Sequence, residues 1–220
     1  FPLADLERRT FQWFWDHGNP ANGLIPDRAP AKSFCSIAAV GFGLTAYAIG
    51  ADRGWITRAQ ARERTLTTLR FFANAKQGKQ ARGVTGYKGF FYHFIDMQSG
   101  ERFGTTELSS IDTVLLLAGM LHAGQYYDRA DAAETEIRAL ATKINNAVDW
   151  PWMLGRGDFI SMGWTPENGF IASQWDRYNE CTLLYLLALG SPTHPVPAKI
   201  WPRWTATWPR AWRTAAAARS

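Results

Sequence analysis

The residues best suited to chemistry are concentrated between Trp164 and Pro195. A stretch rich in aromatic and polar side chains ends in Glu180 and leads directly into the nearly apolar run 181–189. This order predicts a carboxylate at the N-terminus of a buried helix, where the helix dipole favours an anion. Aromatic surfaces combined with a few fixed polar groups are typical of a sugar-binding site.

Two further carboxylates, Glu107 and Asp112, lie near the start of a second apolar stretch. Most glycoside hydrolysis needs two carboxyl groups that flank the scissile bond. Asp112 falls within an otherwise apolar helix, so it must have a partner or face a polar cavity. Five residues of helix separate two side chains by about 140°, so these two share a face only if the first turn is irregular.

A glycosidase acid needs a raised pKa, which usually comes from partial burial among apolar groups. Glu180 is the first candidate, with Trp164, Trp175 and Tyr178 as its possible apolar wall and Asn179 beside it. The alternative is that Glu180 only stabilises the start of its helix.

The aromatic residues that could stack on sugar rings are Tyr92, Trp152, Trp164, Phe170 and Trp175. In a chain that is 14% aromatic, each could equally belong to the core. Asp27, next to Arg28, either lines the rim of the cavity or forms a surface ion pair.

Other chemistries find little support. The four histidines, His17, His93, His122 and His194, are scattered without the spacing of metal ligands. The chain has no nucleophile elbow, phosphate loop or dinucleotide fingerprint. We therefore expect neither a metal site nor a cofactor.

Composition fits one soluble globular domain, at 220 residues, 46% apolar and 20% charged. No apolar run reaches the roughly 18 residues that a membrane-spanning helix needs, so we expect no membrane insertion. The net charge of +5 comes from five basic residues after Glu180, where no acidic residue occurs. The preceding body is balanced, so nucleic-acid binding through the tail is only a minor alternative. Cys35 and Cys181 each begin an apolar run, which predicts buried thiols. The sequence does not decide whether the two form a disulfide.

Helical periodicity dominates the chain. We expect helices near 3–17, 36–49, 57–75, 108–127, 130–148 and 181–189, with a β-hairpin over 90–104 and a second one within 150–163. Uniformly apolar helices alternate with amphipathic ones. This pattern predicts an all-α protein in concentric layers, an α/α toroid with short β-hairpins in its long loops.

Several motifs together resemble the bacterial glucoamylase-like domain family. They are FQWFWD at 11–16, SIAAVGFG at 36–43, ELSSIDT at 107–113, residues 163–175, and YNE at 178–180 with SPTHP at 191–195. The match covers about residues 3–197. The resemblance implies an (α/α)6 toroid related to enzymes that act on β-1,2-glucans, with Glu180 at the central cavity as general acid. It also implies a periplasmic or secreted location and an oligo- or polysaccharide partner.

The chain also departs from that family. A complete toroid has twelve helices, and the sequence predicts six or seven. We therefore expect residues 1–198 to form the N-terminal part of the domain, with apolar surface left exposed, and the basic, Trp/Ala-rich tail 199–220 to lie outside the fold. Relatives acting on β-1,2-glucan have acids where Thr105 and Ser109 stand. The implied function is hydrolysis of the glycosidic bonds of a glucan by Glu180 and a second carboxylate. This activity is lost if the second carboxylate belongs to the missing half of the toroid. The alternative is a non-catalytic carbohydrate-binding module or an inactive fragment.

Overall fold

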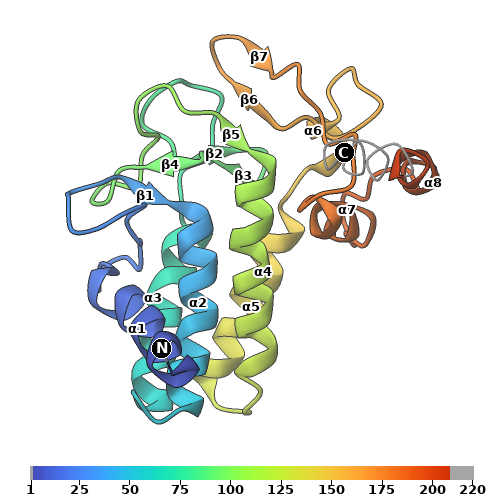
Figure 1. Ribbon diagram of the computed structural model, residues 1–220. Helices are drawn as coiled ribbons and strands as arrows, with labels where there is room; N and C mark the ends of the chain where they lie inside the picture. The colour runs from blue at the N-terminus through green and yellow to red at the C-terminus, as the bar shows by residue number, and fades with distance from the viewer. Residues whose placement is uncertain (1, 209–220) are drawn as a thin grey trace, which may run out of the picture.

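The computed structural model describes residues 2–208 and confirms a helical fold (Figure 1). Its helices are α1 (Leu3–His17), α2 (Ile37–Asp52), α3 (Arg58–Ala73), α4 (Ser110–Tyr126), α5 (Ala132–Asn146), α6 (Trp150–Met153), α7 (Thr182–Leu189) and α8 (Ile200–Thr205). The predicted capping box at Thr57 is present: its side chain accepts from the Gln60 backbone while the Gln60 side chain accepts from the Thr57 backbone. Local signals therefore place most helix starts correctly.

The helices form two layers. The apolar helices α2 and α4 pack against each other, and α4 also contacts α7. The outer helices cover them: α1 and α3 pack on α2, and α5 packs on α4 and α3. This arrangement of inner helices backed by outer ones is part of an α/α toroid (Figure 1).

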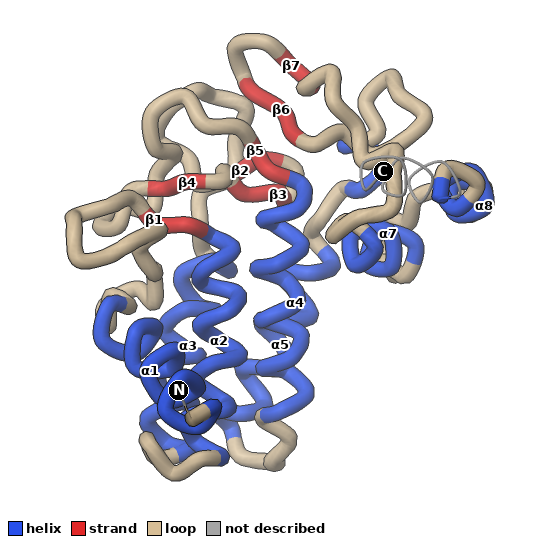
Figure 2. The backbone as a smooth tube through the Cα atoms, viewed as in Figure 1, coloured by secondary structure: helices blue, strands red, loops and turns tan. Residues whose placement is uncertain are grey.

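The seven short strands within residues 2–208 gather at the end of the molecule where α2 and α4 begin (Figure 2). They form three antiparallel sheets: β1 (Cys35–Ser36) with β4 (Phe94–Ile95), β2 (Gly86–Tyr87) with β3 (Phe90–Phe91), and β5 (Leu108–Ser109) with β6 (Gly163–Thr165) and β7 (Gly169–Phe170). Strands β1 and β5 lead directly into α2 and α4, so this end carries the loops that can form a site.

The strand predictions hold only in part. The expected strand 90–95 is divided between β3 and β4, which pair with different partners, and its return is a single bridge between Ile95 and Arg102. The hairpin expected within 150–163 is wrong, because residues 150–153 form α6 and the hairpin lies between β6 and β7. The Asp149 side chain accepts a hydrogen bond from the Trp152 backbone and caps α6, which explains the helix.

The segment after residue 198 differs from its expected place outside the fold. Helix α8 buries Ile200 and Trp204. The Trp204 ring stacks on Tyr185 of α7 with 4.6 Å between centroids, and its Nε1 donates to the Arg177 carbonyl at 3.2 Å. Residues up to 208 therefore pack against the domain, while 209–220 lie outside the described residues.

Large apolar side chains are exposed on the inner helices. Phe42 and Ile49 of α2 are 55% and 39% exposed, and Leu186 of α7 is 52% exposed. Exposed apolar surface was expected from the resemblance. Both cysteines, by contrast, are buried as free thiols, and burial raises each pKa to about 12. Among the described helices, none has the length and apolar character needed to cross a membrane.

Candidate active site

Two of the predicted carboxylates meet at one histidine. The Nδ1 atom of His93 lies 2.9 Å from Oε1 of Glu107, and its Nε2 lies 3.5 Å from Oδ1 of Asp112. All three side chains are partly exposed, Asp112 least at 13%. The imidazole is therefore held between two carboxylates that remain open to solvent. We call these three residues the carboxylate cluster.

The irregular start of α4 brings Glu107 and Asp112 together. Glu107 lies in the extended segment before the helix, so the helical angle between the two residues does not apply. Ser109 caps α4, since its hydroxyl accepts from the Asp112 backbone N–H at 3.2 Å and also donates to Asp112 Oδ2. Ser109 therefore fixes the orientation of Asp112.

The charged forms of His93 and Glu107 stabilise each other. Burial lowers the pKa of His93, but the hydrogen bond that His93 donates to Glu107 and the negative charges of Asp112, Glu107 and Asp27 together raise it above its ordinary value. Burial raises the pKa of Glu107, but the bond to His93 and other favourable contacts lower it overall. Glu107 is thus ionised at neutral pH, which makes it a poor proton donor.

Asp27 forms the surface ion pair that is one of the two alternatives the sequence leaves open. Arg28 Nη2 lies 2.9 Å from Asp27 Oδ2. The Asp27 backbone N–H donates to the Phe34 carbonyl at 2.9 Å, and its charge helps to raise the pKa of His93. Asp27 is therefore a surface ion-pair residue at the edge of the same polar region.

Aromatic side chains that the sequence did not single out flank the cluster. His93 stacks on Phe94 with 3.9 Å between centroids, and Phe34 lies between Phe94 at 4.2 Å and Phe103 at 4.8 Å. Phe103 is 43% exposed. These rings, rather than the tryptophans, supply the apolar surface next to the carboxylates. No local signal marks His93 or the three phenylalanines, because their proximity depends on the pairing of β1 with β4.

The predicted platforms Trp152, Trp164 and Phe170 come together in a different place. They line a cavity of about 830 Å³ together with the 154–157 loop and Asn168. Trp152 and Phe170 are half-buried there, whereas Trp164 is only 6% exposed and belongs mainly to the core. Trp164 pairs with Leu108 and with Phe170 across the sheet, so these side chains share one face. Glu107 precedes Leu108 and points to the opposite face. The strands thus separate the three platforms from the carboxylate cluster.

Two other predicted platforms lie in the core, which differs from the expectation that they offer surfaces for stacking. Tyr92 is fully buried, with the Arg102 guanidinium 4.8 Å from its ring centroid. Trp175 is 8% exposed, and its Nε1 donates to Ser110 Oγ at 2.9 Å. The sequence could not reveal this bond, which joins residues 65 positions apart.

The segment Tyr178 to Glu180 lies on the exposed approach to α7. The Asn179 side chain accepts from the Cys181 backbone at 3.0 Å, and Tyr178 contacts Trp208 with 5.0 Å between centroids. Glu180 is exposed at the beginning of the helix. Within residues 2–208 it lacks the apolar enclosure that a glycosidase acid needs, so its assignment as acid stays a prediction.

Within the described residues, no group of three or more His, Cys, Asp or Glu side chains is arranged to hold a metal ion. The arrangement instead offers two carboxyl side chains, one of them fixed by a hydroxyl, beside aromatic rings. Such a surface can bind hydroxyl groups of a sugar and place a base next to a glycosidic bond.

Comparison with known proteins finds relatives that act on glucans or are described as glucoamylases. The family model "Glycoamylase", described as "Putative glucoamylase", matches residues 172–218. An exo-β-1,2-glucooligosaccharide sophorohydrolase (non-reducing end) from Parabacteroides distasonis is 25% identical over 216 residues, which cover 91% of this chain and 29% of that protein.

Two solved structures show the same fold. The endo-β-1,2-glucanase of Chitinophaga pinensis, in complex with sophorotriose and glucose, has a TM-score of 0.77 and 25% identity. A protein of Bacteroides fragilis NCTC 9343 described as a "putative glucoamylase" has a TM-score of 0.76 and 29% identity. Each match covers 94% of this chain and 50% of the solved chain. These matches confirm the resemblance to the bacterial glucoamylase-like family, and the chain spans about half the length of the solved relatives.

Proposed function

We propose that this protein is a glycoside hydrolase-like protein that acts on a glucan at the carboxylate cluster. The observation that carries the proposal is the imidazole of His93 held between Glu107 and Asp112 at the strand-bearing end of the inner helices. The relatives that are named for their substrates act on β-1,2-linked glucose chains. A β-1,2-glucan is therefore the first substrate to test.

The roles follow from the environments of the carboxylates. Asp112 is our candidate for the base or nucleophile, since Ser109 and His93 fix its two oxygens. Glu107 keeps His93 charged and in place. Glu107 does not serve as the general acid, because its lowered pKa leaves it without a proton at neutral pH. Glu180 remains the candidate for that role.

The exposure of Glu180 favours a second candidate function, a carbohydrate-binding module without catalysis. A glycosidase acid needs partial burial among apolar groups, and Glu180 lacks it within residues 2–208. The cavity that Trp152, Trp164 and Phe170 help to form has no carboxylate among its lining residues and would bind sugar rings without catalysis.

Reducing-end release from β-1,2-glucan and from an α-1,4-glucan distinguishes these functions. For the hydrolase, we expect turnover of the β-1,2-glucan, with Asp112→Asn and Glu180→Gln each lowering it at least about a hundredfold. Glu63→Gln, an exposed carboxylate on α3, is the matched control and should leave turnover unchanged. Glucan binding without any release of reducing ends would assign the module instead.

A further inference from the structure

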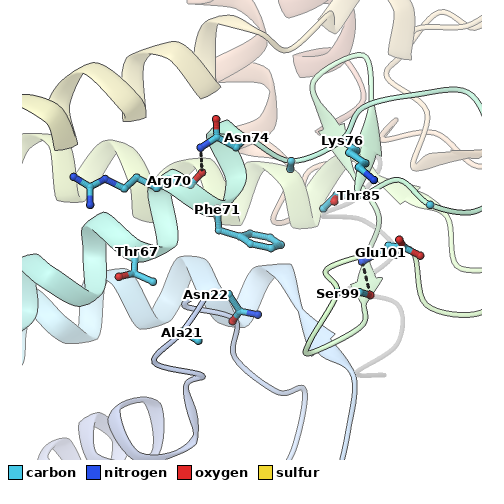
Figure 3. A pocket seen from close by; sticks show the side chains of 12 residues that line it. Ala21, Asn22, Thr67, Arg70, Phe71, Asn74, Lys76, Thr85, Ser99 and Glu101 are labelled. Atoms are coloured by element: carbon cyan, nitrogen blue, oxygen red, sulfur yellow. Dashed lines mark hydrogen bonds between the residues drawn. The ribbon is translucent and has the colours of Figure 1, made fainter.

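A second cavity lies at the C-terminal end of α3, apart from the carboxylate cluster. It has a volume of about 530 Å³ and is formed where α3 meets the 21–22 loop, residues 83–85 and the turn at 99–101 (Figure 3). None of the predicted site residues lines it. Its volume is within the usual range for small-molecule sites.

The walls of this cavity are fixed by hydrogen bonds. Asn22 Nδ2 donates to the Met97 carbonyl at 3.0 Å, which ties the 21–22 loop to the neighbouring turn. That turn is held by Asp96, whose carboxylate accepts from the backbone N–H groups of Gln98 and Ser99. Thr85 N donates to the Lys76 carbonyl at 2.9 Å. A ligand would therefore enter a preformed site and would not need to order it.

One aromatic ring and several uncommitted polar groups face the cavity. The Phe71 ring projects from α3 into its middle, toward the turn that carries Ser99 and Glu101 (Figure 3). In the described part of the chain, the side chains of Lys76, Thr85 and Glu101 form no hydrogen bond or ion pair, although Thr85 is only 4% exposed. Arg70, by contrast, is already bound to Glu136 through two hydrogen bonds of 2.7 and 2.6 Å.

These groups define the chemistry of the ligand. Lys76 only donates hydrogen bonds, Glu101 only accepts them, and Thr85 does both. Their opposite charges disfavour an anion and a cation alike, so the ligand should be neutral and carry both donors and acceptors. A sugar ring meets these conditions, because its hydroxyls can bond to all three side chains while its C–H face lies against an aromatic ring.

We propose that this cavity is a second saccharide site, which holds a neutral glucan segment outside the carboxylate cluster. The inference depends on the proposed function for the choice of glucan. Its role would be to retain a long chain on the protein surface while another segment of that chain occupies the cluster.

The test is an NMR titration of the ¹⁵N-labelled chain with short β-1,2-linked gluco-oligosaccharides. We expect two separate groups of shifted amides, one around Thr85 and Ser99 and one around His93 and Glu107. In Lys76→Met/Glu101→Gln, the shifts near Thr85 should need about tenfold or more oligosaccharide, while those near His93 stay unchanged. Both substituted side chains are exposed and unbonded, so the fold should be kept.

Arg8→Gln on the exposed face of α1 is the control and should change neither group. Glu107→Gln should weaken only the shifts near His93. Unmoved amides at Thr85 and Ser99 at millimolar oligosaccharide would overturn the second site, whatever happens at the cluster. Unmoved amides at His93 and Glu107 would count against the proposed function alone.

Discussion

His93 and Glu107 are joined twice, once through their backbones and once through their side chains. The His93 N–H donates to the Glu107 carbonyl at 2.9 Å, and Nδ1 lies 2.9 Å from Oε1 of the same residue. The backbone bond fixes how closely the segments approach, so the side-chain contact needs little further ordering. A charged imidazole placed this way stabilises the ionised form of Glu107 and is itself stabilised by it.

The first prediction is the pH dependence of this pair. The pKa of His93 is raised above its ordinary value of 6.5, so its contribution to stability is complete below that pH and is lost as pH rises through the higher folded value. The pKa of Glu107 is lowered from 4.5, so its contribution is present above that pH and is lost as pH falls through the lower folded value.

An NMR titration of the His93 ring protons measures this directly. We expect a midpoint above 6.5 in the native protein and a lower midpoint in Glu107→Gln. The exposed His122 on α4 serves as the internal reference in the same spectra. A His93 midpoint that is equal in both proteins would show that the contact with Glu107 has no electrostatic effect.

The fold was more predictable than the site, for physical reasons. Helix starts depend on residues a few positions apart, such as Thr57 and Gln60, and can be read locally. The buried character of α2 follows from its uninterrupted apolar composition. Strands of two residues carry no such signal, and their partners are distant in sequence.

The site could be predicted only in its acidic residues. Glycoside hydrolysis needs two carboxyl groups, which makes Glu107 and Asp112 candidates, and a charge within an apolar helix predicts a partner for Asp112. The sequence does not identify His93 as that partner, because spacing does not reveal a contact made across paired strands. Trp175 was expected at a sugar-binding surface, but it is buried and bonded to Ser110.

The second prediction concerns the ion pair that joins α3 to α5. Glu134 is fully buried at its side chain and accepts two hydrogen bonds of 2.8 Å from Arg58. Chiefly because of the bond from Arg58, its pKa is lowered to about 2. Glu134→Ala leaves the partly buried Arg58 with only the exposed Asp128 as a carboxylate partner, so it should lower the free energy of unfolding by about 3–5 kcal/mol.

Glu136, two residues along the same outer helix, supplies the matched control. It pairs with Arg70, but both side chains are partly exposed, at 38% and 54%. Exposed pairs contribute little, so Glu136→Ala should cost less than about 1 kcal/mol. Urea unfolding of both variants checks the difference. Equal costs would mean that burial of Glu134 adds nothing to the link between these helices.

The third prediction assigns Trp175 a structural role. Its Nε1 is buried and donates to Ser110 Oγ, which in turn donates to the Ser161 carbonyl at 2.8 Å. Ser110→Ala leaves the indole N–H without this acceptor and should cost about 1–3 kcal/mol of unfolding free energy. Ser99→Ala in the exposed turn before β5 should cost clearly less, because its hydroxyl is near solvent. If Ser110→Ala lowered the free energy of unfolding as little as Ser99→Ala does, the bond to Trp175 would not contribute to stability.

The last prediction tests the contact between the inner helices, where two glycines allow α2 and α4 to touch. A Cβ added at Gly41 would lie 2.2 Å from the Leu115 carbonyl oxygen, and one at Gly119 would lie 2.1 Å from the Gly41 carbonyl oxygen. Both obstacles are backbone atoms, so the helices must separate to admit a methyl group. Gly41→Ala should therefore lower the free energy of unfolding by about 1–3 kcal/mol or more.

Gly124, also on α4, is the control, because a Cβ there would meet only the Ala141 methyl at 3.5 Å, an ordinary contact. Gly124→Ala should stabilise the protein by roughly 0.5–1 kcal/mol, since alanine is the better helix former. Thermal unfolding of the two variants should thus shift in opposite directions, and a shift in the same direction would contradict the close approach of α2 and α4.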